Sequence, residues 1–200
     1  MYSQNDEEAK IVEFFGTRPG RFLDVGAFDG VTFSNTHRLL ELGWSGVMVE
    51  PSPVNFYALV GNTAKYAERV TLIPAAVSRI PGLHKFWMDN TPTRGWSSTM
   101  NSEMLAIGSV MKPNPASIMV PTLKLSHLSS FGPYDFISID AEGEDLGIME
   151  DDDSFLPVLY ACRLLCVEKG QTREKMLHAC KGHGFKTIFH ETPENLLLTK

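Results

Sequence analysis

The sequence is poor in cysteine: it contains Cys162, Cys166 and Cys180 and no Cys-x-x-Cys pair. An odd number of cysteines without that spacing argues against a disulfide framework or a zinc ribbon and predicts reduced thiols. Cys162 and Cys166 are expected to be core residues. A metal site at His178, Cys180 and His183 is a weak alternative, because a helix is expected to end there.

Long apolar runs are also absent, because no stretch approaches the roughly 18 apolar residues of a membrane span. The first ten residues are polar and acidic. We therefore expect a cytoplasmic protein without a membrane partner. Basic residues are in the minority, since 18 Lys and Arg against 24 Asp and Glu give a formal net charge of −6. Binding to phosphate backbones needs a basic surface, so this balance argues against a nucleic-acid partner.

The composition itself is that of an ordinary globular protein. Of the 200 residues, 43% are hydrophobic and 21% are charged, which excludes disordered and collagen-like classes. This length is enough for one domain with a sizeable core. We expect residues 1–200 to form a single domain, and the composition predicts no particular oligomeric state.

Short apolar runs alternate with stretches of helical pattern. The runs expected to form strands are 21–25, 46–49, 70–77, 134–139 and 163–167. The stretches expected to form helices are 35–42, 54–65 and 172–180. This alternation is typical of a parallel sheet covered by helices. Two strand-like pieces, 185–189 and 196–198, predict a closing hairpin.

Residues 82–124 interrupt the alternation. Two strand-like segments, 82–88 and 118–124, flank a stretch rich in Pro, Ser, Asn and Met. A long insertion in a compact domain commonly serves as a lid or a binding segment. We expect this role here, with a plain flexible loop as the alternative. The candidate acceptor-binding residues in it are Arg94, Trp96, Ser97 and Ser98.

Four acidic residues stand in or at the carboxyl ends of predicted strands: Asp24, Glu50, Asp140 and Glu168. In a parallel sheet these ends share one crevice, which is the usual ligand site. A carboxylate in an apolar run is costly unless it is paired, hydrogen-bonded or directed at a ligand. The pattern therefore predicts an acidic ligand cleft, although a structural role remains open for each residue alone.

The turn after the first expected strand reads DVGAFDG over 24–30. Gly26 and Gly30 allow a tight turn close to a ligand. A dinucleotide-binding loop would need glycine where Asp24 and Asp29 stand, and these carboxylates would repel a pyrophosphate. Glu50 follows Gly30 by 20 residues and is placed to accept hydrogen bonds from a ribose. An adenosine ligand with a cationic tail in place of phosphate is S-adenosylmethionine.

Two longer motifs carry a family resemblance. The run FLDVGAFDGVTFSNTHRLLELGWSGVMVEPSP at 22–53, followed by ISIDAEGEDL at 137–146, resembles the FkbM family of S-adenosylmethionine-dependent methyltransferases. The resemblance covers most of the chain. It implies an α/β, Rossmann-like class I methyltransferase fold. Such a fold has a mostly parallel seven-stranded sheet, helices on both faces and a C-terminal antiparallel hairpin.

The resemblance also implies a set of cofactor-binding residues. The glycine turn would surround the methionine moiety and Glu50 would bind the ribose. Pro51, Ser52, Ala76 and Val77 would lie at the adenine. The helix start after the turn would lie near the cofactor carboxylate. The full set is Asp24, Gly26, Ala27, Phe28, Asp29, Gly30, Ser34, Asn35, Glu50, Pro51, Ser52, Ala76, Val77 and Asp140.

Asp140 and Glu142 match the Asp-x-Glu-Gly motif that the family places near the reactive methyl group. We expect Asp140 to act as general base or to orient the acceptor, with Glu142 as its partner, since neighbouring carboxylates raise each other's pKa. A role limited to holding cofactor or backbone is the alternative. Glu168 is a further acceptor-side candidate. The chain departs from the family at Ser138, where a lysine is usual, and at Asp145, where a glutamate is usual.

The resemblance implies methylation of a hydroxyl group on a small molecule or a saccharide. One alternative is a non-catalytic module that binds the cofactor, motivated by Ser138. Another is a nucleotide-dependent oxidoreductase, which the loop aspartates oppose. A divalent metal held by Asp140, Glu142 and Glu168 would activate a hydroxyl differently. It is not favoured, because no histidine is nearby in the sequence.

Overall fold

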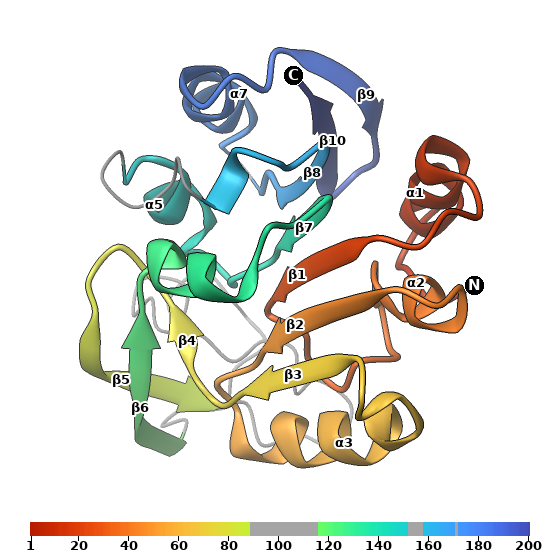
Figure 1. Cartoon of the computed structure of the whole chain (residues 1–200). Coiled ribbons are helices and arrows are strands. Elements are labelled where there is room, and N and C mark those ends of the chain that lie inside the picture. Colours follow the sequence, from red (N-terminus) through yellow and green to blue (C-terminus); the bar gives the residue numbers. More distant parts are fainter. Residues whose placement is uncertain (89–115, 152–157, 171) are drawn as a thin grey trace.

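A computed structural model describes residues 1–88, 116–151, 158–170 and 172–200. Seven strands form one sheet in the order β3-β2-β1-β7-β8-β10-β9 (Figure 1). The strands β3, β2, β1, β7 and β8 are parallel to one another, and β10 is antiparallel to both β8 and β9. Their bounds are β1 Arg21–Val25, β2 Ser45–Val49, β3 Val70–Ile73, β7 Phe136–Ile139, β8 Leu164–Glu168, β9 Thr187–Glu191 and β10 Asn195–Thr199. The predicted sheet and closing hairpin are confirmed.

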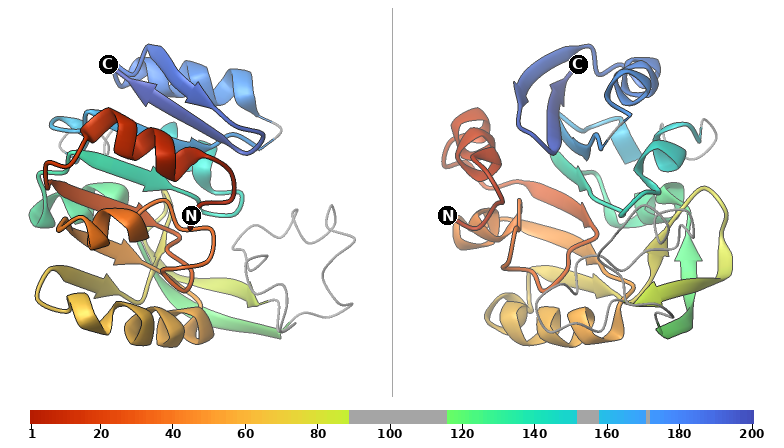
Figure 2. Two further views of the ribbon diagram at one scale, coloured as in Figure 1. Left: turned by 90° about the vertical axis from the view of Figure 1, so that its right-hand side faces the viewer. Right: turned by 180° about the vertical axis from the view of Figure 1, so that it is seen from behind.

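Helices cover both faces of the sheet (Figure 2). One face carries α1 (Glu7–Phe15), α2 (His37–Glu41) and α3 (Pro53–Thr63), which is followed by the short η1 (Ala64–Tyr66). The other face carries η3 (Leu125–Phe131), α5 (Asp145–Met149) and α7 (Arg173–Gly182). These helices create two apolar cores, one on each side of the sheet.

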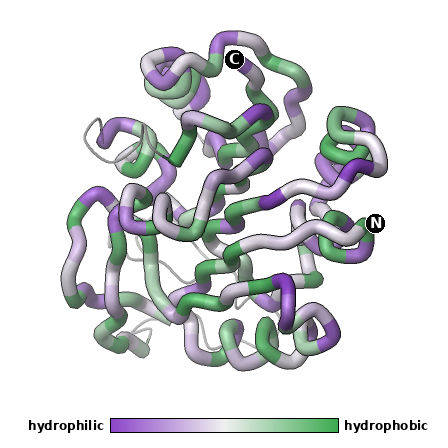
Figure 3. The backbone as a smooth tube through the Cα atoms, in the orientation of Figure 1, coloured by the Kyte–Doolittle hydropathy of each residue, from purple (hydrophilic) through white to green (hydrophobic). Residues whose placement is uncertain are grey.

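The alternation of side chains along β1 explains the two cores. Phe22 packs with the α1 and α2 side, whereas Leu23 and Val25 pack with the α5 and α7 side. All three side chains are buried, and each contributes roughly 1.5–3 kcal/mol of transfer free energy. Figure 3 shows hydrophobic residues along the central strands.

A second, three-stranded sheet contains the ends of the inserted segment. Its order is β4-β6-β5, with β4 at Ala76–Val77, β5 at Gly82–Met88 and β6 at Ala116–Leu123. The prediction of one strand over 70–77 was wrong. Pro74 stands between β3 and β4, and a proline has no N–H to continue a ladder. The chain changes sheets there.

Other differences concern short or polar elements. Helices α1 and α5 were not predicted, because α1 begins in the polar first ten residues and α5 has five residues. All three cysteines are free and buried, as expected for core thiols. His183 binds the Met149 carbonyl through Nε2 at 2.8 Å. Within the described ranges, no helix is long and apolar enough to cross a membrane.

Candidate functional site

A cavity of about 340 Å³ opens beside the carboxyl ends of β1, β2, β7 and β8. It lies where the sheet order reverses between β1 and β7, which is the usual ligand position in such sheets. We call this cavity the cleft. It brings together most of the predicted site residues from distant parts of the chain. These are Asp24, Gly26, Ala27, Phe28, Ser34, Asn35, Glu50, Pro51, Ala76, Val77, Asp140, Glu142 and Glu168.

Three predicted residues support the cleft from outside its lining. Asp29 Oδ1 accepts hydrogen bonds from the N–H groups of Val31 at 2.8 Å and Thr32 at 2.7 Å, which holds the turn after β1. Ser52 is the N-cap of α3 and is buried.

Gly30, the third of these residues, packs against α3. A Cβ on Gly30 would lie 2.6 Å from Leu59 Cδ1. The four acceptor candidates Arg94, Trp96, Ser97 and Ser98 lie outside the described residues.

Gly26 makes the closest backbone contact in the cleft. Its φ is +79°, and a Cβ there would lie 1.7 Å from the carbonyl oxygen of Asp140. The N–H groups of Gly26 and Ala27 both donate to the Val49 carbonyl at 3.0 Å. The turn is therefore pressed between the ends of β2 and β7, and only glycine fits at position 26.

Glu50 is fixed by backbone donors on both carboxylate oxygens. Oε2 accepts from the Phe28 N–H at 2.9 Å, and Oε1 accepts from the Ser52 N–H at 2.8 Å. The side chain is only 5% exposed. Burial raises the pKa of Glu50 to about 7, although these hydrogen bonds oppose the shift. Oε1 also accepts from Asn55 Nδ2 at 3.5 Å, whereas Oε2 keeps a second lone pair, so the carboxylate can still accept a hydrogen bond from a ligand.

Asp24 lies in the same cleft, near the centre of the sheet. It is 5% exposed and accepts a hydrogen bond from the Thr36 hydroxyl at 2.5 Å. Burial raises the pKa of Asp24 to about 6. A carboxylate removed from water in this way is stabilised by a cation that enters the cleft.

A group of carboxylates surrounds the end of β7. Oxygens of Asp140, Asp145 and Glu168 lie within 4.8 Å of one another. The Asp140 side chain faces the cleft, and Glu142 adopts a φ of +49° in the turn that follows. Removal from bulk water, followed by the charges of Glu168 and Glu142, raises the pKa of Asp140 well above its ordinary value. Burial and the charge of Glu168 also raise the pKa of Glu142.

Asp145 holds the turn in which Asp140 and Glu142 stand. Its Oδ1 accepts from the Ala141 N–H at 2.7 Å and its Oδ2 from the Gly143 N–H at 3.1 Å. The side chain is buried. These bonds stabilise the positive φ of Glu142, which is unusual for a residue other than glycine. Asp145 therefore acts first as a backbone anchor.

A divalent metal would find a different ligand set from the predicted one. The described residues group Asp140, Asp145 and Glu168, whereas Glu142 is not in this group. Both oxygens of Asp145 already accept backbone hydrogen bonds. The carboxylates that the structure groups thus differ from the predicted metal ligands by Asp145 in place of Glu142.

Several lining residues were not predicted from the sequence. Ser78 Oγ donates to Glu144 Oε2 at 2.7 Å, which connects the small sheet to the turn after β7. Glu144 stands within the 137–146 motif, so its position two residues after Glu142 could have predicted that it lines the cleft. The ends of the chain gave no such signal for Gln4 and Glu194. The further residues of this kind are Val25, Thr32, Phe33, Val49, Asn55, Ala75, Phe86, Ser138 and Ala141.

The lining of the cleft is strongly acidic. It contains seven carboxylates, and among the described residues it contains no Lys, Arg or His. Such a cleft attracts a ligand with positive charge and repels a pyrophosphate. The seven are Asp24, Glu50, Asp140, Glu142, Glu144, Glu168 and Glu194.

Comparison with known families agrees with this chemistry. The sequence pattern of the methyltransferase FkbM domain matches residues 24–187, which include the glycine turn, Glu50 and the carboxylates after β7. The chain belongs to the FkbM methyltransferase family. No curated protein matches the sequence.

Solved structures similar to this chain share its fold at low sequence identity. The FkbM methyltransferase from Methylobacillus flagellatus KT superposes with a TM-score of 0.57 and 13% identity, covering 90% of this chain and 43% of that one. The present chain thus spans less than half of that relative.

Two further structures have other stated activities. The precorrin-6y C5,15-methyltransferase from Geobacter metallireducens GS-15 has a TM-score of 0.55 and 12% identity, covering 100% of this chain and 91% of that one. The ribosomal protein L11 methylase from Lactobacillus delbrueckii subsp. bulgaricus has a TM-score of 0.52 and 15% identity, covering 97% and 76%. These likenesses establish the Rossmann-like class I methyltransferase fold.

Family membership implies S-adenosylmethionine as the methyl donor, and the cleft of this chain fits that group. The cofactor carries a sulfonium and an ammonium, which suit an acidic lining without cationic side chains. The glycine turn lets backbone N–H groups approach a ligand. A cavity of about 340 Å³ falls within the size range of small-molecule sites.

Proposed function

We propose that this FkbM methyltransferase transfers the methyl group of S-adenosylmethionine to a hydroxyl oxygen of a small molecule or a saccharide. The observation that carries the proposal is Asp140, which faces the cleft among carboxylates that raise its pKa. A carboxylate with a raised pKa is a stronger base, and loss of the hydroxyl proton requires a base near the acceptor oxygen.

The proposed cofactor contacts follow the shape of the cleft. Glu50 accepts a hydrogen bond from a ribose hydroxyl, because its carboxylate is oriented by two backbone N–H groups and retains a free lone pair. Pro51, Ala76 and Val77 supply the apolar surface for the adenine. The remaining contacts to the methionine moiety come from Asp24, Gly26, Ala27, Phe28, Ser34, Asn35 and Asp140.

Asp29, Gly30 and Ser52 take part in this proposal as supports. Asp29 holds the turn after β1, Gly30 packs it against α3, and Ser52 caps α3 beside Glu50. Their substitution is expected to alter cofactor affinity through the shape of the cleft.

The acceptor side of the cleft lies beyond Asp140. When bound, the cofactor supplies an electrophilic methyl group on a sulfonium. Asp140 orients the acceptor hydroxyl and accepts its proton, and Glu142 and Glu168 keep the proton affinity of Asp140 high through their negative charge. Positioning of the acceptor oxygen opposite the sulfur contributes the larger part of the rate.

We also propose that residues 1–200 act as one domain and that segment 82–124 borders the acceptor. Its described flanks are β5 and β6, which pair along their lengths. Phe86 on β5 lines the cleft and packs with Ala76 and Val120. This apolar contact joins the small sheet to the site.

Transfer of an isotopically labelled methyl group tests the proposed reaction. The purified chain is incubated with labelled S-adenosylmethionine and a panel of methyl glycosides, simple alcohols and primary amines. The proposal predicts a product whose methyl carbon has the NMR shift of a methyl ether. Asp140→Asn is expected to lower the turnover by two or more orders of magnitude, which is a larger factor than its effect on cofactor affinity.

Other outcomes distinguish the alternatives. A methyl group on nitrogen or carbon would refute O-methylation and retain the methyltransferase. Tight cofactor binding without transfer to any member of a broad panel favours a non-catalytic binding module. An Asp140→Asn variant with full turnover would remove Asp140 from the mechanism.

A further inference from the structure

Residues 2–6 run along one side of the cleft, and we call them the strap. At one end, Ser3 forms a parallel β-bridge with Phe33, directly before Ser34 and Asn35. Tyr2 donates its hydroxyl hydrogen bond to Glu41 Oε1 at 2.9 Å. These contacts place the strap beside the loop between the glycine turn and α2.

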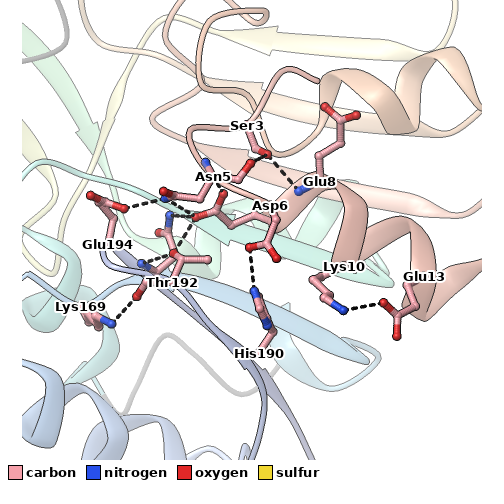
Figure 4. A network of polar contacts seen from close by, with 12 residues as sticks. Ser3, Asn5, Asp6, Glu8, Lys10, Glu13, Lys169, His190, Thr192 and Glu194 are labelled. Carbon is pink, nitrogen blue, oxygen red and sulfur yellow. Dashed lines mark hydrogen bonds and ion pairs between the residues drawn. The ribbon is translucent and has the colours of Figure 1, made fainter.

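The other end of the strap is fastened to the β9–β10 turn (Figure 4). Asn5 Nδ2 donates to Glu194 Oε2 at 2.6 Å and to Glu7 Oε1 at 3.1 Å. Glu7 is fully buried and also accepts from the Thr192 hydroxyl at 2.7 Å and Asn195 Nδ2 at 3.0 Å. A buried carboxylate with this many donors is costly to disturb, so this end of the strap is held firmly.

Gln4 lies between these two attachments. Gln4 is one of the residues that line the cleft; it is exposed, and it makes no hydrogen bond to any residue that the structure describes. Its neighbours on the strap are held on both sides. The side-chain amide of Gln4 is therefore presented to the cleft with its donors available.

The acidic lining creates a specific need for such a donor. S-adenosylmethionine carries a carboxylate at its amino-acid end, and seven carboxylates line the cleft without a described cationic side chain. The other amide at this end, Asn35, already donates to Ser138 Oγ at 3.2 Å, and Ser34 Oγ accepts from the His37 N–H at 3.0 Å. A neutral amide can satisfy a ligand carboxylate without attracting the surrounding acids.

We propose that Gln4 binds the amino-acid end of the cofactor, with its side-chain amide donating a hydrogen bond to the carboxylate. This inference rests on the proposed cofactor placement. Gln4 and Glu194 both lie outside residues 24–187, the part of the chain that matches the FkbM domain. Asn5 positions the strap through its hydrogen bond to Glu194.

Two ligands that differ only at the amino-acid end provide the test. S-adenosylhomocysteine has the carboxylate and the ammonium, whereas 5′-methylthioadenosine has the same nucleoside and thioether without them. Calorimetric titration of both into the full chain is expected to show that Gln4→Ala weakens S-adenosylhomocysteine about tenfold, as loss of one charged hydrogen bond does. Binding of 5′-methylthioadenosine is expected to stay within about twofold of the unsubstituted chain.

Gln4→Glu gives a sharper comparison, because it keeps the side-chain length and replaces the donor with a negative charge. It is expected to weaken S-adenosylhomocysteine more than Gln4→Ala does. Ala9→Glu is the matched control, since it adds the same charge at an exposed position on α1 and is expected to change neither affinity. Gln4 is exposed and has no partner to lose among the described residues, so these variants are expected to fold normally.

Unchanged S-adenosylhomocysteine affinity in Gln4→Ala would overturn this role. Equal weakening of both ligands would do the same, because it would indicate a general disturbance of the cleft. If the unsubstituted chain binds neither ligand, the proposed cofactor site fails as well. Ligand binding by the unsubstituted chain therefore shows whether the proposed role of Gln4 alone is wrong or the proposed cofactor site is wrong as well.

Discussion

Replacing Glu50 with Gln tests whether burial of this carboxylate makes the free energy of unfolding fall as the pH rises. Burial raises the pKa of Glu50 to about 7 from an ordinary value of 4.5. The folded chain therefore keeps a proton on Glu50 in a pH range where the unfolded chain has lost it. The free energy of unfolding falls as pH rises through this range, from about 4.5 to about 7.

The size of the effect follows from the shift. Each pH unit between the two pKa values changes the free energy of unfolding by about 1.4 kcal/mol. Between pH 5 and pH 8, Glu50 therefore contributes a loss of about 2.5 kcal/mol. Glutamine does not titrate, so Glu50→Gln removes this part of the pH dependence. The glutamine amide has one acceptor oxygen, so it accepts one of the two backbone hydrogen bonds. Loss of the other bond lowers the free energy of unfolding by an amount that does not depend on pH.

Urea unfolding at several pH values measures the difference. Trp44 is buried and reports unfolding by fluorescence. The fall in the free energy of unfolding between pH 5 and pH 8 is expected to be about 2.5 kcal/mol smaller in Glu50→Gln than in the unsubstituted chain. Glu68→Gln, at an exposed turn before β3, is the control and is expected to keep the original pH dependence. An equal fall in the free energy of unfolding between pH 5 and pH 8 in the unsubstituted chain, Glu50→Gln and Glu68→Gln would refute the reasoning.

Three further predictions concern the cleft. Gly26→Ala is expected to lower the thermal midpoint and remove its rise with S-adenosylmethionine, because a Cβ would meet the carbonyl at the end of β7 at 1.7 Å; an unchanged rise in scanning fluorimetry would contradict this. Asp145→Asn keeps one acceptor oxygen, so one amide among Ala141 and Gly143 loses its partner at a cost of about 1–3 kcal/mol. Faster hydrogen exchange at one of these amides is the expected NMR result, and unchanged exchange at both would count against the anchor. Because burial raises the pKa of Glu50 to about 7, calorimetric affinity for S-adenosylmethionine is expected to rise about 30-fold from pH 5.5 to pH 8, in proportion to the ionised fraction of Glu50, whereas a flat profile would argue against an ionised Glu50 in the complex.

Most of the sheet was predictable because its strands are short, apolar and bounded by turns. The expected strand 21–25 coincides with β1, and 82–88 coincides with β5. The segment 70–77 was misread because apolar content continues through Pro74, although its missing N–H ends the ladder. Helix α1 was missed because its stability comes from packing against the sheet, which the local pattern does not reveal.

The centre of the cleft was predictable because parallel strands place their carboxyl ends together. Asp24, Glu50, Asp140 and Glu168 follow that rule and line one cavity. The strap was not predictable, because Asn5, the neighbour of Gln4, is held by Glu194, a residue nearly 190 positions away. A contact between residues so far apart cannot be predicted from their spacing in the sequence.

Calorimetric titration of S-adenosylmethionine tests the central claim most directly. The unsubstituted chain is expected to bind the cofactor at one site, and Glu50→Ala is expected to lower the affinity by about two orders of magnitude, because a ribose hydrogen bond to a carboxylate is lost. NADH is expected not to bind. Binding of NADH without S-adenosylmethionine, or equal cofactor affinity in Glu50→Ala, would contradict the assignment of the cleft.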